Sequence, residues 1–393
     1  MKKISYKRQI LRMLIALEAL VLLFVILLLL KNNQQVCEFF ATTFSRAWIF
    51  LFGNLLGWIP ISFYELFLIV VILGAIALVV FIVIFLCKHK WKRLLSTVLI
   101  VGLAVMTFLN VYTATASFSY GRDHLPDEVY SEYSGDDLTF EEAVEIASIL
   151  IDRANAAYRA TDHDEDGNIV YPYSFRQISK MLAKEYERLE SKYFSPYTPN
   201  AKKIINKRIM SEMHIVGVFF APFGEANING YETNFYLPQT MAHEMAHGKG
   251  VMREYEADLV ASYICLTSDN PYLSYGALVK CLSSALSMVW LYPNSTQAVN
   301  ELDDMLDKAI LKERSNYSIF YGQFTLLDDI GEFFNDLYLK LNKQEDGTGS
   351  YVKPGEVTGT GQKDDDGHEI VQIINFSATQ NLLIKLYKEG KLY

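Results

Sequence analysis

Three long apolar runs within the first 118 residues constrain the fold of this chain more than any other feature. They cover about residues 10–30, 63–87 and 94–117, and each reaches the roughly 20 residues that a helix needs to cross a bilayer. A cleaved signal peptide is the alternative for the first run, but no small-residue cleavage site follows Leu30. We therefore expect three membrane-spanning helices.

The segment between the first two runs, about residues 36–60, is rich in aromatic residues and only moderately apolar. Its most apolar stretch, Ala47 to Ile59, is too short to cross a bilayer and contains two glycines. We expect an interfacial or re-entrant helix hairpin here.

Basic residues predict the orientation in the membrane, because cytoplasmic loops carry an excess of Lys and Arg. The segments Met1–Arg12 and Lys88–Arg93 are basic, so both are expected in the cytoplasm. With three spans, residues 119–393 then form an extracytoplasmic domain that follows a membrane domain at 1–118. This orientation inverts if the segment at 36–60 also spans.

Charge and cysteine content exclude some classes of function. The net charge of −9 argues against nucleic acid as a partner. The chain has four cysteines and no CxxC, so a cysteine-ligated metal is not expected. Whether Cys265 and Cys281 form a disulfide is left open.

The second domain contains an HExxH sequence, His243 to His247, in a segment expected to be helical. Residues four apart lie on one face of a helix, so both imidazoles can bind one metal ion. Glu244 is placed to take a proton from a metal-bound water. A zinc hydrolase needs this combination of two nitrogen ligands and a nearby carboxylate.

A third ligand is expected on a second helix at about residues 252–266. Glu254 and Asp258 share one face of that helix, whereas Glu256 points elsewhere. We predict that Glu254 binds the metal and that Asp258 holds a ligand histidine by its other ring nitrogen. The alternative for Glu254 and Glu256 is an acidic first turn that the helix dipole favours.

The HExxH followed by Glu254 and Asp258 resembles the gluzincin class of zinc peptidases, which includes thermolysin. Over nearly its whole length the chain is more closely similar to bacterial membrane proteins that carry domain of unknown function 3810. The residues that carry this resemblance are Ala221–Asn229, Leu237–His247, Arg253–Asp258, Asn335–Asn342 and Gly349–Tyr351. The chain departs from that family's usual Asn at Asp258, which leaves the ligand set intact. The resemblance implies a membrane-anchored metallopeptidase-like domain and supplies no substrate.

Gluzincins use a downstream His or Tyr to stabilise the oxyanion of the tetrahedral intermediate, and the resemblance extends this role to two candidates. Tyr351 and His368 both lie in or near the polar, Gly- and Asp-rich stretch at 343–369, which is expected to be a long loop over the active site. Ordinary surface positions are the alternative for both, because loop residues of these types are mostly exposed.

A further acidic stretch has two interpretations. Asp162, Asp164 and Asp166 match the first carboxylate positions of a calcium-binding loop, with Gly167 at the sixth position. Tyr173 stands where such a loop needs a bidentate carboxylate. The stretch is therefore either a weak calcium site or a polar turn before a strand.

Taken together, the sequence predicts a mainly helical α+β chain, in which three transmembrane helices precede a gluzincin-like zincin domain with a small β-sheet. Strands are expected at about 214–222 and 227–237, and by resemblance one of them holds an extended substrate. The expected function is hydrolysis of a peptide or protein substrate by a zinc enzyme anchored in the lipid bilayer. The alternatives are a zinc-binding sensor or scaffold without proteolysis and a zinc hydrolase of cell-envelope material.

Overall fold

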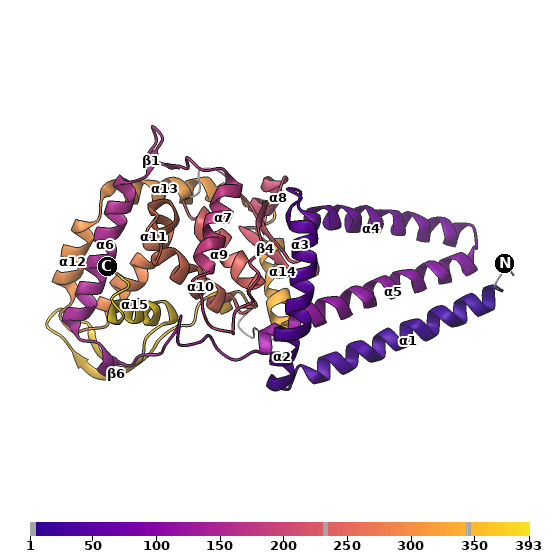
Figure 1. Cartoon of the computed structure of the whole chain (residues 1–393), viewed down its shortest axis with the longest axis horizontal. Helices are drawn as coiled ribbons and strands as arrows, with labels where there is room; N and C mark the ends of the chain where they lie inside the picture. Colours follow the sequence, from indigo (N-terminus) through magenta and orange to yellow (C-terminus); the bar gives the residue numbers. More distant parts are fainter. Residues whose placement is uncertain (1–4, 231–234, 343, 345–346) are drawn as a thin grey trace. The chain divides into compact units, whose positions relative to one another are not determined.

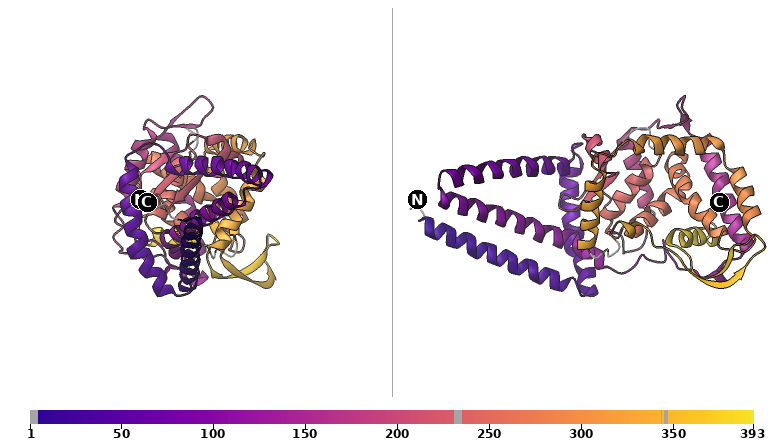
Figure 2. Two further views of the ribbon diagram at one scale, coloured as in Figure 1. Left: turned by 90° about the vertical axis from the view of Figure 1, so that its right-hand side faces the viewer. Right: turned by 180° about the vertical axis from the view of Figure 1, so that it is seen from behind.

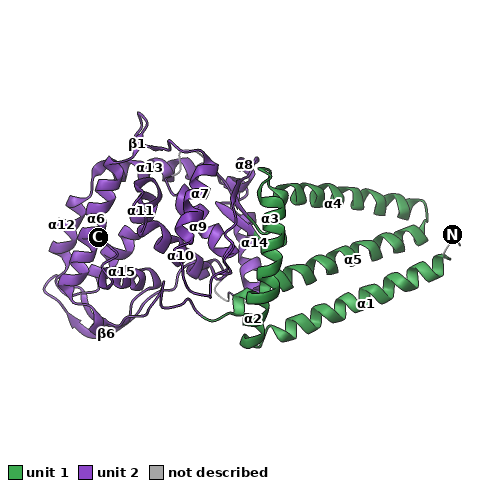
Figure 3. Ribbon diagram, viewed as in Figure 1, with its two compact units in different colours: residues 1–123, 220–225 green, residues 124–219, 226–393 purple. Residues whose placement is uncertain are grey.

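The computed structural model of the chain describes residues 5–230, 235–342, 344 and 347–393, and these are mainly helical with small β-sheets (Figure 1). The chain divides into two compact units (Figure 3). Unit 1 comprises residues 1–123 and 220–225, and unit 2 comprises residues 124–219 and 226–393. The first boundary lies close to the predicted one after residue 118, but no sequence pattern indicated that residues 220–225 belong to unit 1.

Unit 1 contains the three predicted apolar helices, α1 (Tyr6–Leu30), α4 (Phe63–Cys87) and α5 (Trp91–Thr115). They run side by side, with α5 between α1 and α4 (Figures 1 and 2). The most apolar part of α4 has a mean hydropathy of 3.5, and none of its residues is buried. A helix that is apolar on all sides and unburied requires an apolar solvent such as lipid.

The segment predicted as a helix hairpin is instead one continuous helical stretch, which corrects that prediction. Helix α2 (Gln34–Phe40), the π-helical η1 (Ala41–Ser45) and α3 (Arg46–Gly57) follow one another without a break. The two glycines that suggested a turn lie inside and at the end of α3, where helical geometry accommodates them. Within unit 1, α3 runs crosswise to α1, α4 and α5 (Figure 1).

Length and composition qualify four helices of the described chain to cross a membrane: α1, α4, α5 and the stretch Gln34–Gly57. The last of these has 24 residues and a mean hydropathy of only 1.2. These helices indicate a membrane protein. How many of them cross the bilayer, and in which direction, stays a prediction.

Residues 220–225 are anchored in unit 1 by aromatic packing and by one buried carboxylate. The rings of Phe220 and Phe223 lie 5.4 and 6.0 Å from that of Phe67 on α4. Glu225 accepts a hydrogen bond from the backbone N–H of Phe63 at 3.0 Å, at the N-terminal end of α4 where N–H groups lack helical partners.

Unit 2 is built around two long helices, α6 (Phe140–Arg159) and α11 (Pro271–Val289), which pack against each other. Helix α6 begins with the capping box that its sequence indicates, because Thr139 and Glu142 exchange side-chain hydrogen bonds with each other's backbone. Most of α11 is buried within unit 2.

The largest sheet of the described residues has three strands, β3 (Ala201–Lys203), β4 (Gly217–Phe220) and β5 (Glu225–Ile228), in the order β3–β5–β4. Strand β4 lies within the first predicted strand and is shorter than expected. Strand β5 shares only residues 227 and 228 with the second predicted strand, so that prediction was largely wrong. Residues 231–234 of the second predicted strand lie outside the described residues, and its last residue, Leu237, begins a helix. Strand β3, which is parallel to β5, was not predicted. Strand β4 is an edge strand of this sheet.

The stretch predicted as a long loop at 343–369 is largely ordered, which is a second correction. It contains the 3₁₀-helix η4 (Gly347–Tyr351) and β6 (Glu356–Lys363), which pairs with β7 (Glu369–Asn375) in a hairpin seen clearly in Figure 2. The Gly- and Asp-rich composition suggested a loop, but β6 forms by pairing with β7, which is more apolar.

Shorter elements complete the units. They are η2 (Ser117–Gly121), η3 (Gly135–Asp137), β1 (Asp162–His163), β2 (Ile169–Val170), α7 (Phe175–Tyr186), α8 (Lys207–Glu212), α9 (Leu237–Gly248), α10 (Glu254–Leu266), α12 (Thr296–Met305), α13 (Lys308–Gly322), α14 (Asp328–Leu341) and α15 (Ala378–Lys388).

Candidate metal centre

Two consecutive helices, α9 and α10, carry the candidate site and pack against each other. Helix α9 has Pro238 in its first turn, where a missing N–H costs nothing. It ends at Gly248, and Gly250 follows with φ +95°, a left-handed conformation that glycine adopts without strain. This tight connection turns the chain so that the first turn of α10 faces the last turns of α9.

His243, His247 and Glu254 form a buried group that could hold a metal ion. Their candidate ligand atoms all lie within 4.8 Å of one another. The Nε2 atoms of His243 and His247 are 3.1 and 3.5 Å from the same oxygen, Oε2 of Glu254. Only 8%, 6% and 5% of the three residues is exposed. The structure thus brings together the three residues that the sequence predicts as ligands.

The other nitrogen of each ring is fixed by an acceptor. Nδ1 of His243 lies 2.9 Å from Oδ1 of Asp258, and Nδ1 of His247 lies 2.7 Å from the carbonyl oxygen of Val251. A carboxylate and a backbone carbonyl can only accept, so both Nδ1 atoms donate. Asp258 therefore stands where the sequence predicts it, behind a ligand histidine.

The donor set fits a cation. When both Nδ1 atoms carry a proton, the two Nε2 atoms and the Glu254 carboxylate are three acceptors that converge with no donor among them. Either a second proton on His243 or a metal ion can resolve this conflict. Burial alone would lower the pKa of His243, but its hydrogen bonds to Asp258 and Glu254 raise it from 6.5 to about 10. Without a metal, the site therefore holds a proton in the place that a cation would take.

Glu244 is buried next to the ligand group but does not belong to it. It lies against Gly217 of β4, where a β-carbon would be 2.6 Å from Cγ of Glu244. Burial raises the pKa of Glu244 to about 7, although the nearby imidazoles of His243 and His247 oppose this shift. The carboxylate can therefore gain and lose a proton near neutral pH. The importance of Gly217 was missed, because only the fold brings it to α9.

Lys280 of α11 extends the site behind Asp258. Its Nζ donates to Oδ1 of Asp258 at 2.9 Å. Burial would raise the pKa of Asp258, but the charge of Lys280 and the hydrogen bond from His243 outweigh it and hold that pKa well below its usual range. Asp258 is thus a stable anion that connects Lys280 to His243. Lys280 is a single charge within an otherwise apolar stretch, and no local sequence pattern indicates its contact with Asp258.

Glu256 points away from the centre, as the helical phase predicts. It forms an ion pair with Arg253, and its Oε1 lies 3.3 Å from Nδ1 of His124. The acidic first turn that the alternative interpretation required is also real, because both Glu254 and Glu256 are in it. The two acids nevertheless differ in surroundings, and only Glu254 faces the histidines.

Tyr351, one of the two candidate oxyanion donors, lies at the centre. Its ring is stacked near that of His243, with 6.3 Å between the centroids and 23° between the planes. Loss of hydration and the negative charges of Glu254 and Glu244 raise the pKa of Tyr351, and a hydrogen bond with Asn335 opposes the shift. The hydroxyl group therefore keeps its proton and can donate it in a hydrogen bond.

His368, the other candidate, lies elsewhere. It follows the turn between β6 and β7, its ring is 5.5 Å from that of Trp290, and its N–H donates to Asp364. With Asp364 and Asp366 it forms a second group with metal-ligand spacing, but this group is at the surface, where such clusters are common without an ion. The contacts described for His368 do not include the residues of the centre.

The acidic stretch at 162–166 forms the polar turn and gives no support to a calcium loop. Oδ1 of Asp164 accepts from the backbone N–H groups of Asp166 and Asn168 at 3.0 and 2.8 Å. Asp162 accepts instead from the hydroxyl group of Tyr272 at 2.7 Å. The carboxylates of Asp162, Asp164 and Asp166 are thus not among the described groups that could share a metal ion.

The fold and the site together define a membrane protein with a buried candidate metal centre in its second unit. The chain belongs to the family described as protein of unknown function (DUF3810), whose model matches residues 40–354. This confirms the resemblance to proteins with domain of unknown function 3810, and the matched range contains the whole candidate centre. No curated protein and no solved structure shows a significant match to the chain.

Proposed function

We propose that the protein is a membrane-anchored zinc-dependent metallopeptidase with a zincin-like domain. One observation carries the proposal: two imidazole nitrogens and one carboxylate oxygen converge beside a second buried carboxylate that is not a ligand. Structural zinc sites have four protein ligands, whereas catalytic sites have three and leave one position open. His243, His247 and Glu254 fit the catalytic pattern.

Each residue of the centre then has a chemical role. His243, His247 and Glu254 would hold the ion, which when bound supplies a water whose pKa is about 7. Glu244 accepts a proton at its carboxylate and later delivers it to the leaving amine. Its raised pKa of about 7 suits both directions of transfer. Asp258 keeps the His243 ring in one tautomer and orientation.

Two further features favour a peptide as substrate. Strand β4 is an edge strand, and Gly217 at its start touches Glu244. We propose that its backbone pairs with an extended substrate chain beside the general base. The ring of Tyr351 lies beside that of His243, and we propose that its hydroxyl group donates to the oxyanion that forms when the carbonyl is attacked.

A sensor or scaffold that only binds zinc has no need of a buried base, so Glu244 argues against it. A hydrolase of cell-envelope amides would use the same chemistry as a peptidase. We therefore treat both as outcomes of one experiment and not as further proposals.

The experiment compares the purified full-length protein with Glu244→Gln on a peptide library and on cell-envelope material, with and without a chelator. We expect both proteins to bind about one zinc per chain and the variant to cleave on the order of 10³-fold more slowly. Glu256→Gln is the matched control, because Glu256 shares the first turn of α10 and points away from the centre. If both proteins bind zinc and neither cleaves anything, the enzyme proposal is wrong. If the unaltered protein cleaves only cell-envelope material, the protein is a zinc hydrolase but not a peptidase.

The proposed orientation has α1, α4 and α5 as spans, a cytoplasmic N-terminus and the candidate centre outside the cytoplasm. The positive charges at Lys88–Arg93 support it, as does the crosswise course of α3 within unit 1 (Figure 1). Gln362→Cys on the exposed strand β6 tests it in a Cys87→Ser background, because the other three cysteines are buried. An impermeant thiol reagent should label intact cells. Labelling only after lysis would reverse the orientation.

A further inference from the structure

Helix α14 has three faces of different character. Gly331 and Leu339 lie on a buried face. A β-carbon at Gly331 would be 2.8 Å from the Cα of Met213, so this face packs closely against the rest of unit 2. A second face is charged and carries Asp329, Glu332, Asp336 and Lys340. The third face is apolar and points away from the unit.

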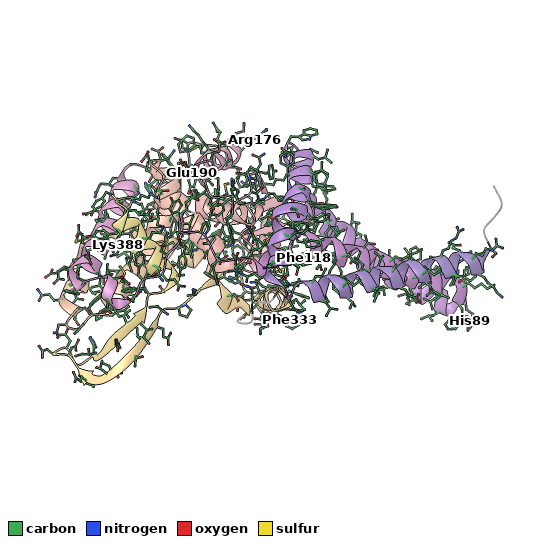
Figure 4. The ribbon with its side chains drawn as sticks, turned by 60° about the horizontal axis from the view of Figure 1, so that its bottom comes forward. His89, Phe118, Arg176, Glu190, Phe333 and Lys388 are labelled. Atoms are coloured by element: carbon green, nitrogen blue, oxygen red, sulfur yellow. The ribbon has the colours of Figure 1, made fainter. Side chains whose placement is uncertain are left out.

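The apolar face is a continuous stripe over the length of the helix. Its residues follow the spacing i, i+3, i+4, i+7, i+8 and i+11, which places them on one side of a helix. The most exposed are Leu341 at 71%, Phe333 at 62% and Phe334 at 56%. Phe333 is labelled in Figure 4. We call this surface the α14 stripe, and its members are Ile330, Phe333, Phe334, Leu337, Tyr338 and Leu341.

We propose that the α14 stripe inserts into the surface of the lipid bilayer in which the chain is anchored. A helix that lies in the membrane interface has an apolar face with aromatic and leucine side chains opposite a charged face, and α14 has both. The charged face of such helices is usually rich in Lys and Arg, whereas that of α14 is mainly acidic. Unit 2 is covalently joined to the apolar helices of unit 1, so it stays attached to any bilayer that these helices enter.

The charge of α14 defines the kind of lipid contact. Its charged face has three acidic residues and one lysine, and that lysine already forms an ion pair with Asp336 at 2.8 Å. Attraction to anionic headgroups therefore cannot drive the contact, and burial of apolar side chains must supply the free energy. Insertion is thus expected in purely zwitterionic lipid and independent of salt.

The stripe is also connected to the candidate centre. Asn335, on the same helix, forms the side-chain hydrogen bond with Tyr351, and the ring of Tyr351 stacks near His243. Helix α14 and η4 pack closely along this connection. A bilayer that holds α14 would therefore also steady Tyr351. Contact with the bilayer would then help to hold the candidate centre in its active arrangement.

The test measures the depth of two labels on one helix. Phe334→Cys on the stripe and Glu332→Cys on the charged face are made separately in the full-length Cys87→Ser chain and labelled with an environment-sensitive fluorophore. Each protein is reconstituted into phosphatidylcholine vesicles, with and without bromine on the acyl chains. We expect brominated lipid to quench the label at residue 334 at least about threefold more than the label at residue 332, and added salt to leave this ratio unchanged.

Two results would overturn the proposal. Equal quenching of both labels would show that the stripe stays in water. The second result is a label at residue 334 that is shielded from water but not quenched by brominated lipid. If this shielding falls as the protein is diluted in the vesicles, a second copy of the chain covers the stripe. The measurement does not depend on catalysis, so it stands whether or not the protein is a peptidase.

Discussion

Glu244 on α9 is in contact with the backbone of Gly217 on β4, and a β-carbon at Gly217 would be 2.6 Å from Cγ and 2.8 Å from Cδ of Glu244. The two residues are far apart in the sequence and come from different kinds of element. Their contact fixes the distance between the candidate general base and the edge strand that is proposed to hold the substrate. No side chain larger than hydrogen fits at residue 217 unless Glu244 moves.

The substitution Gly217→Ala should therefore displace Glu244 and leave the metal ligands in place. We expect catalytic rate to fall roughly 10²-fold, because a shift of about 1 Å in a reacting group has that effect, while zinc content stays unchanged. Gly322→Ala is the control, since a β-carbon there meets nothing within 4 Å. Full activity of Gly217→Ala would mean that Glu244 is not the base or can relax freely.

Metal binding should release a proton. The metal-free His243 has a pKa raised from 6.5 to about 10, so it is charged at neutral pH, and binding requires the neutral imidazole. Titration calorimetry in buffers of different ionisation enthalpy should show about one proton released per zinc near pH 7.5, with affinity rising with pH. Fewer protons should be released per zinc in Asp258→Asn. If the unaltered protein releases no proton, His243 is not protonated in the metal-free site.

The same shift has a consequence for stability in the metal-free protein. Because the pKa of His243 is higher in the folded than in the unfolded chain, its protonation stabilises the fold fully below about pH 6.5, and this contribution is lost as the pH rises through about 10. Thermal unfolding with chelator present should therefore show a falling Tm over this range. The fall should be smaller in Asp258→Asn.

Lys280 should control metal affinity without touching the metal. Lys280→Met leaves Asp258 without its cation, so the hydrogen bond to His243 is expected to loosen and zinc affinity to fall about 10- to 100-fold, as for other residues behind metal ligands. Competition with a chromophoric chelator measures this directly. Lys280→Arg should restore most of the affinity, and Lys180→Met at an exposed position of α7 should have no effect. Unchanged zinc affinity in Lys280→Met would show that Lys280 does not contribute to metal binding.

Tyr351 should act on the reaction and not on the metal. Tyr351→Phe keeps the ring beside His243 but removes the hydroxyl group. We expect kcat to fall about 10²- to 10³-fold, the effect of losing one donor to an oxyanion, with KM and zinc affinity little changed. A loss of zinc in this variant would instead indicate that the ring supports the fold of the centre. His368→Ala is the matched control, because the described contacts of His368 are with Trp290 and Asp364 and not with the residues of the centre.

The sequence predicted the parts of the site that follow from helical periodicity. His243, His247, Glu254 and Asp258 lie on two helices joined by a short turn, so spacing alone indicates which side chains face one another. The same reasoning separated Glu254 from Glu256. The capping box at Thr139 is a local pattern of the same kind, because it depends on residues three apart.

Contacts that depend on the three-dimensional fold could not be predicted. Gly217 and Lys280 reach the centre from β4 and α11, and neither has a local pattern that indicates its role. Tyr351 and His368 were equivalent as sequence candidates, since only the packing of η4 and the β6–β7 hairpin distinguishes them. The hairpin itself was taken for a loop because cross-strand pairing, and not composition, defines it.

The membership of residues 220–225 in unit 1 bears on how this protein can be produced. A recombinant fragment that begins after the last apolar helix would keep these residues but remove the part of unit 1 that they pack against. Phe220 and Phe223 would lose the ring of Phe67, and the buried Glu225 carboxylate would lose the N–H groups at the start of α4. Only Val218 and Phe219 separate Gly217 from Phe220 in β4. The lost contacts of such a fragment would lie close in sequence to Gly217, which touches Glu244. Inactivity of a truncated preparation would therefore say nothing about the intact membrane protein.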